Sequence, residues 1–307
     1  MAAALSSAIF LGLAPVFGKL AINMGYTPFT VVALRTGLAA GLLLAYFSIF
    51  HRHYLYIFPI GLLGCILAGV INGLGSLFYY LALKRLDASL GQLLYSLYPF
   101  FVALWLILDH QPPSRLTFFR IFLATIAIIL LTSEPKRSID ITGVLMMLVG
   151  SVLYAMHLPI NQRVLYEVPA PTVALYTLLS MSAVVIPAYL IFDRSLPPPN
   201  IPIYPIIGLT FVTLFSRIAL FLGVKKIGGM QTALLGLAEL LITIIFSGIL
   251  LGEKLSILQW VGVIGLCTSL FLVLYEQPAP PSRGGKTGWL SWIRPPGLPK
   301  DMFGPYE

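Results

Sequence analysis

Residues 229–251 read GMQTALLGLAELLITIIFSGILL, an apolar run with a single ionisable side chain, Glu239. A helix needs about 20 mostly apolar residues to cross a bilayer, so this run is long enough. Its small and polar residues recur at helical spacing and therefore share one face: Thr232, Gly236, Glu239, Thr243 and Ser247. The run predicts a spanning helix whose polar face is turned toward the interior of a helix bundle.

The composition of the whole chain agrees with this reading. Of 307 residues, 58% are hydrophobic and 10% are charged, and the mean hydropathy is +0.93. A soluble domain is about 45–50% apolar and about 25% charged. The composition excludes an ordinary soluble enzyme, a secreted disulfide scaffold and a disordered chain, and it predicts an all-α integral membrane protein. The net charge of +8 comes from Lys and Arg between apolar runs and in the tail, which suits lipid headgroups better than nucleic acid.

Ten apolar runs are long enough to be transmembrane helices, separated by short polar or proline-containing breaks. They cover residues 4–23, 30–50, 56–83, 88–108, 116–133, 140–162, 171–192, 203–224, 229–251 and 256–275. The runs at 116–133 and 256–275 are the least polar, and we expect them at the lipid-facing periphery. Residues 277–307 are rich in proline and predict a flexible tail.

A weak internal repeat divides the chain into halves of five spans. A shift of 141 residues brings Pro28 onto Pro169 and Leu93-Leu94 onto Leu234-Leu235. We therefore expect one repeat over residues 1–135 and a second over 136–276. Because each repeat holds an odd number of spans, the second is inserted upside down. Inverted repeats are a design of secondary transporters, with the substrate site near the midplane between the halves.

Several local motifs resemble one known family. Gly12 precedes Lys19, Ala33-Leu34-Arg35 begins the second span, and Leu97-Tyr98-Pro99 lies in the fourth. The ninth span ends in Leu251-Gly252-Glu253-Lys254-Leu255. Over residues 5–275 the chain resembles the EamA-type branch of the drug/metabolite transporter superfamily. The resemblance implies two five-helix repeats and a secondary transporter that moves small polar metabolites by alternating access. Amino acids or related compounds, moved outward, are the leading substrate class.

Three ionisable residues lie deep inside the spans, where such groups usually face a cavity or each other. Glu239 can bind a proton or a substrate amine, or it can be a structural partner of Arg217. Arg217 offers paired donors to a substrate carboxylate, or it pairs with Glu239 or reaches an interface. His157 is either a functional group or a hydrogen-bonded interior histidine. Lys19 and Arg35 lie nearer to helix ends, and snorkelling explains them without a functional role.

Further polar and aromatic residues predict faces that line the same cavity. Asn72, Ser76 and Tyr79 share a face of the third span, and the repeat shift places Ser76 opposite Arg217. In the fourth span Gln92, Tyr95 and Tyr98 share a face, and Tyr98 corresponds to Glu239. Tyr154 lies on the face of His157. These tyrosines either stack on a substrate or fill gaps between helices.

Other classes of function find less support. No Ser-His-Asp order, HExxH motif, cofactor motif or Cys/His metal spacing occurs, so we expect no enzyme activity, no cofactor and no metal. A membrane enzyme acting on lipid intermediates and a non-transporting membrane scaffold are the alternatives. With both termini in the cytoplasm, the inside segments hold ten Lys and Arg and the outside loops six. This favours an inner (plasma) membrane protein with cytoplasmic termini. Its partners would be a small-molecule substrate and the bilayer, with proton coupling and facilitated diffusion both compatible with the sequence and no nucleic acid.

Overall fold

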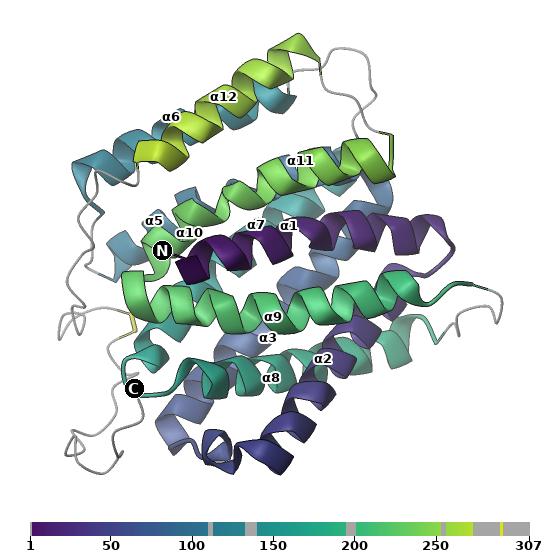
Figure 1. The fold of residues 1–307 in the computed structure, drawn as a ribbon, viewed down its shortest axis with the longest axis vertical. Helices are drawn as coiled ribbons and strands as arrows, with labels where there is room; N and C mark the ends of the chain where they lie inside the picture. Colours follow the sequence, from purple (N-terminus) through teal and green to yellow (C-terminus); the bar gives the residue numbers. More distant parts are fainter. Residues whose placement is uncertain are drawn as a thin grey trace.

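A computed structural model describes residues 2–109, 113–132, 140–194, 201–252, 256–272 and 289–290, and these residues form helices and turns without a strand. The α-helices are α1 (Ala2–Asn23), α2 (Pro28–Phe50), α3 (Pro59–Arg85), α4 (Ala88–Tyr95), α5 (Tyr98–Leu108), α6 (Arg115–Thr132), α7 (Ile141–Leu165), α8 (Ala170–Phe192), α9 (Tyr204–Ile227), α10 (Gly229–Gly236), α11 (Ala238–Leu250) and α12 (Ile257–Phe271). A short 3-10 turn, η1 (Arg52–Leu55), precedes α3. Figure 1 shows most of these helices lying roughly parallel or antiparallel to one another.

Eight of the helical segments are long and apolar enough to cross a membrane. Two of the eight are interrupted: α4 with α5 and α10 with α11. Helices α6 and α12 are not among these eight. The chain is therefore a multi-pass helical membrane protein, and the number of ten spans stays a prediction.

The ends of the helices follow from local sequence. Thr27 caps α2, because its hydroxyl accepts a hydrogen bond from the backbone N–H of Thr30 at 3.2 Å and Pro28 occupies the first helical position. Asp140 caps α7 in the same way through the N–H of Gly143 at 3.2 Å. Gly228, with φ of +84°, allows α9 to end and α10 to begin within one residue.

The fourth and ninth spans are not the continuous helices that we expected. Helix α4 ends at Tyr95 and α5 begins at Tyr98, next to Pro99, which has no N–H to continue the helix. In the second repeat α10 ends at Gly236, a weak helix former, and the N–H of Leu237 bonds three residues back to Leu234 at 3.3 Å. Both α4 and α10 have eight residues, and they start 141 residues apart. The interruption is therefore a feature of both repeats.

The two halves pack through equivalent pairs of helices. Helix α3 packs on α7 and α1 packs on α9, α2 packs on α8, and α6 packs on α12. At the crossing of α3 and α7 a Cβ on Gly75 would lie 3.3 Å from the carbonyl oxygen of Gly150, so the absence of side chains lets the backbones approach. Figure 1 shows α6 and α12 together at one edge of the bundle, which agrees with their expected peripheral place.

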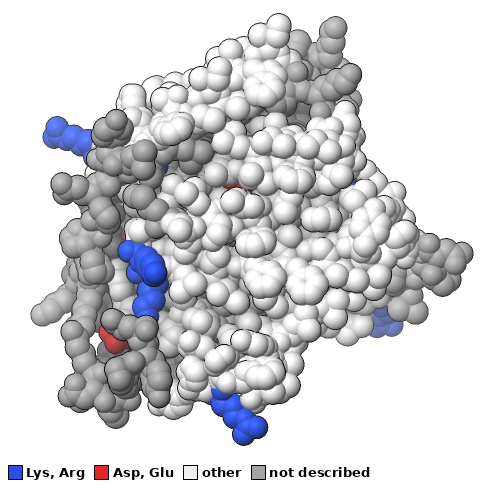
Figure 2. Space-filling view, in the orientation of Figure 1, with Lys and Arg blue, Asp and Glu red and all other residues white. Residues whose placement is uncertain are grey.

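The outer surface is apolar over a broad band. Figure 2 shows a wide uncharged face with Lys and Arg gathered toward its ends. Large apolar side chains are exposed on several helices, for example Phe122, Leu190 and Ile264 at 63%, 51% and 63%. In water such a surface would be costly, whereas lipid chains solvate it. The surface thus fits the membrane location given by the helix lengths.

Candidate functional site

A polar cavity lies at mid-depth between the two halves of the chain and holds about 420 Å³ of space. Helices of both halves contribute to its wall. The lining residues are Leu11, Ala14, Arg35, Asn72, Ser76, Tyr79, Tyr80, Gln92, Tyr95, Tyr154, Arg217 and Glu239.

Arg35 of α2 projects its guanidinium into this cavity and is 6% exposed. Its two terminal nitrogens donate to Ser76 Oγ of α3 at 2.5 Å and to Thr213 Oγ1 of α9 at 3.1 Å. The guanidinium carbon also lies 4.8 Å from the ring centre of Tyr80, within the range of a cation–π contact. Arg35 therefore joins a helix of the first half to one of the second.

Arg217 of α9 lies beside Arg35 and is 4% exposed. The side-chain oxygen of Asn72 accepts from its two terminal nitrogens at 2.9 and 3.0 Å in the amide orientation that satisfies both groups. Its Nη1 also lies 3.4 Å from Nε2 of His157. The other ring nitrogen of His157, Nδ1, contacts the carbonyl of Tyr154. Since a carbonyl only accepts, Nδ1 carries the proton, and Nε2 presents its lone pair to Arg217.

Glu239 is the acidic group of the cavity and lies in the first turn of α11, next to the interruption. It is 3% exposed, and its Oε2 accepts from Gln92 Nε2 at 3.3 Å. Gln92 in turn accepts from the hydroxyl of Tyr79 at 3.2 Å. This chain of hydrogen bonds runs from α3 through α4 to α11. A carboxylate near the positive end of a helix is favourably placed for its charge.

Most of the residues predicted from the sequence meet in this cavity. Eight line it: Glu239, Arg217, Tyr79, Asn72, Ser76, Tyr95, Gln92 and Tyr154. His157 lies behind Arg217, and Tyr98 lies behind the wall, where its hydroxyl donates to the carbonyl of Ala233 at 3.0 Å. Tyr98 does not share a helical face with Gln92, because the interruption separates α4 from α5.

Two sequence interpretations are wrong in this structure. Glu239 and Arg217 do not form an ion pair, because the ion pairs among the described residues are Arg85–Asp140 and Arg163–Asp109. Arg35 does not snorkel to an interface, because it lines the cavity. Its position seven residues into a spanning helix was the only sequence signal for this role, and the same signal fits a snorkelling arginine.

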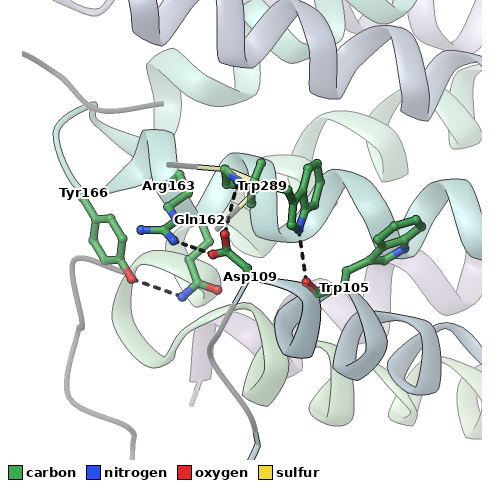
Figure 3. Close-up of polar contacts among 7 residues, drawn as sticks. Trp105, Asp109, Gln162, Arg163, Tyr166 and Trp289 are labelled. Carbon is green, nitrogen blue, oxygen red and sulfur yellow. Dashed lines mark hydrogen bonds and ion pairs between the residues drawn. The ribbon is translucent and has the colours of Figure 1, made fainter. Parts of the chain in front are cut away.

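A second buried polar cluster lies at the ends of α5 and α7, away from the cavity (Figure 3). Asp109 pairs with Arg163, and both side chains are buried, at 1% and 6% exposure. Asp109 also accepts from the backbone N–H of Leu290 at 3.2 Å, and the indole N–H of Trp289 donates to the carbonyl of Trp105 at 3.2 Å. Beside them Gln162 donates to the hydroxyl of Tyr166 and accepts from the N–H of Gly229.

This cluster anchors part of the segment that we expected to be a flexible tail. Leu290 is fully buried. The rest of that tail, residues 277–288 and 291–307, lies outside the described residues, as do residues 253–255 of the motif that ends the ninth span.

Arg120 is a buried charge that sequence reasoning assigned to a loop. It lies in α6 with 0% exposure, donates through Nε to the carbonyl of Ser269 in α12 at 3.1 Å, and donates through Nη1 to Gln231 at 3.1 Å. It therefore joins the peripheral pair α6 and α12 and ties the pair to α10. Within the part of the chain that the structure describes, no three His, Cys, Asp or Glu side chains gather in a way that could hold a metal ion.

The fold and the cavity define a multi-pass helical membrane protein with a buried polar site between two repeats. The EamA-like transporter family matches residues 1–133 and 141–275, and the chain therefore belongs to this family. A comparison with curated proteins finds no significant match. One solved crystal structure has a similar fold, with 16% identity and a TM-score of 0.65, over 88% of this chain and 97% of the other.

Proposed function

We propose that the protein is a secondary transporter that exports small polar metabolites, with amino acids or related compounds as the leading class. The observation that carries this proposal is the mid-depth cavity, where Arg217 and Glu239 of the second half meet Asn72 and Gln92 of the first. A zwitterion fits these groups, since a guanidinium binds a carboxylate and a carboxylate binds an ammonium. Membership of a transporter family supports the same conclusion.

The proposal includes ten spans in two inverted repeats, residues 1–135 and 136–276, in the inner membrane with both termini in the cytoplasm. Equivalent packing of α3 on α7 and of α9 on α1 supports the repeat. Two halves of similar structure and opposite orientation can exchange conformations, so the central cavity opens to one side and then to the other. Helices α6 and α12 would be the fifth and tenth spans.

The interrupted helices give this exchange a physical basis. Each interruption lies next to a cavity group, Tyr95 in the first repeat and Glu239 in the second. A half-helix can tilt at such a break without disrupting the hydrogen bonds of the other half. Movement of α11 would carry Glu239 relative to Gln92 and so change the site as the cavity changes sides. Proton binding by Glu239 is one way to couple this movement to a gradient.

The experiment that tests the proposal is counterflow in proteoliposomes with a panel of labelled amino acids, with and without a pH gradient. We expect saturable counterflow of at least one compound. We expect Glu239→Gln to lower transport without lowering the yield of folded protein, because the amide keeps the volume and loses the charge. Glu167→Gln is the matched control, since Glu167 lies outside the cavity, beyond the end of α7.

Two results would contradict parts of the proposal. Absence of counterflow across the panel, with folded protein verified, would overturn the assignment of amino acids. An equal loss of folded protein and of transport in Glu239→Gln would make Glu239 a structural residue. A gradient effect in the wild type that disappears in Glu239→Gln would identify this carboxyl as the coupling group.

A further inference from the structure

The charges of the cavity do not balance. Its lining residues include two guanidinium groups, Arg35 and Arg217, and one carboxyl group, Glu239, and the remaining lining side chains are uncharged. Within the described residues neither arginine has a carboxylate oxygen within the 4.0 Å of an ion pair. A buried charge without a counter-charge is costly, and deep in a membrane protein it usually marks a ligand pathway.

The two guanidinium groups lie close to each other. Arg35 bonds to Ser76 and Thr213, whereas Arg217 bonds to Asn72 and comes from the same helix as Thr213. Asn72 and Ser76 are one turn apart on α3, and Thr213 and Arg217 are one turn apart on α9. One turn of an α-helix rises about 5.4 Å. The two cations are thus held about one helical turn apart between α3 and α9.

The contacts of the two arginines are with uncharged acceptors and leave donors unused. Ser76, Thr213, Asn72 and His157 supply oxygen or nitrogen lone pairs without a negative charge. The Nε atoms of Arg35 and Arg217 are buried and have no hydrogen-bond partner. Arg–carboxylate and Arg–phosphate pairs use such donors in parallel, so these nitrogens are suited to an anionic group.

We propose that the substrate carries an anionic side-chain group in addition to an α-carboxylate and an α-amine. This inference rests on the proposed transport of amino acids and names their class. Arg217 binds the α-carboxylate, Glu239 binds the ammonium, and Arg35 binds the side-chain carboxylate or phosphate. Such a ligand has a net charge of −1 with a carboxylate, and it neutralises a cavity whose two cations exceed its one anion.

The test compares pairs of amino acids that differ in the side-chain charge. Labelled glutamate and glutamine, aspartate and asparagine, and phosphoserine and serine are exchanged by counterflow under identical conditions. We expect at least one acidic member to have a half-saturating concentration about 10-fold or more below that of its uncharged partner. In Arg35→Gln we expect this ratio to fall close to one. Arg52→Gln, on an exposed arginine at the other end of α2, is the control and keeps the ratio.

A binding measurement decides the matter if Arg35→Gln does not fold. Glutamate should raise the unfolding temperature of the wild-type protein in detergent, and glutamine at the same ionic strength should raise it less. An equal rise with sodium chloride alone would overturn the proposal, because the site would then take any small anion.

The outcomes separate this inference from the proposed function. Counterflow of acidic members in preference to uncharged members supports both. Counterflow of glutamine, asparagine or serine without a preference for the acidic partner overturns the inference and leaves amino-acid transport standing. Absence of counterflow in all three pairs overturns both.

Discussion

Substitution of Gly236 by alanine is expected to damage the wall of the cavity. Gly236 ends α10, and a Cβ at this position would lie 1.8 Å from the hydroxyl oxygen of Tyr98 and 3.2 Å from Oε1 of Glu239. No real contact is as short as 1.8 Å, so Tyr98 must move. The ring is 2% exposed and cannot swing into open space, and its hydrogen bond to the carbonyl of Ala233 at 3.0 Å would break.

The magnitude follows from three terms. Overpacking a buried site costs about 1–3 kcal/mol. Loss of the Tyr98 hydrogen bond costs about 0.5–1.5 kcal/mol. Replacing glycine by alanine in a helix recovers up to about 1 kcal/mol. We expect Gly236→Ala to lose about 2 kcal/mol of stability, which lowers the unfolding temperature by about 4 °C in a chain of this size. Transport should fall as well, because Tyr98 is pushed toward Tyr154, whose ring lies 5.0 Å away.

The assay is thermal unfolding of purified protein in detergent, paired with counterflow. Gly41→Ala is the control, because a Cβ there has no atom within 4 Å and should be neutral or stabilising. Tyr98→Phe provides the sharper test. It removes the oxygen at 1.8 Å and leaves the ring carbon at 3.1 Å. The double variant should therefore be more stable than Gly236→Ala alone. A single variant as stable as the wild type, or a double variant without rescue, would refute the reasoning.

Three further perturbations test other parts of the structure. Asp109→Asn leaves the buried Arg163 without the charge of its partner, and we expect a loss of about 3–5 kcal/mol, measured as thermal stability; an unchanged midpoint would contradict a buried ion pair. The Arg85 guanidinium holds the pKa of Asp140 below its ordinary value of 3.8, so the stability from this pair is present above that value and is lost as the pH falls through the lowered pKa. Arg85→Gln should raise that pKa in an NMR titration, and an identical titration curve would exclude the contact. Leu290→Ala should cost about 2 kcal/mol in the same unfolding assay, because the side chain is fully buried, and no change would show that the segment is not docked in solution.

The helical spans could be predicted because the bilayer sets their length. An apolar run of about 20 residues has few other uses, and the polar face of residues 229–251 is buried as its spacing predicts. The interruptions could not be predicted with the same certainty. Pro99 is a visible helix breaker, but Gly236 is one of many glycines in the chain. Whether a glycine interrupts a helix depends on the side chain that packs against it, here Tyr98.

The role of Arg35 shows where sequence periodicity ends. A face of one helix can be read from spacing, but the neighbour of that face depends on how the helices pack. Arg35 reaches Ser76 and Thr213, which are distant in sequence and come from different halves. The docking of Leu290 against Asp109 was missed for the same reason, since a proline-rich segment gives no periodic signal for a contact across the molecule.

The repeat is symmetric in its backbone and asymmetric in its chemistry. Asn72 and Thr213 are equivalent under the shift of 141 residues, as are Ser76 and Arg217, and all four contact or supply a guanidinium of the cavity. Similar backbones allow the two halves to exchange conformations. Different side chains at equivalent positions allow the cavity to bind a substrate whose two ends differ, because one end meets a carboxylate and the other meets arginines. A symmetric cavity would bind both orientations equally, so this asymmetry fixes how the substrate lies while the halves exchange around it.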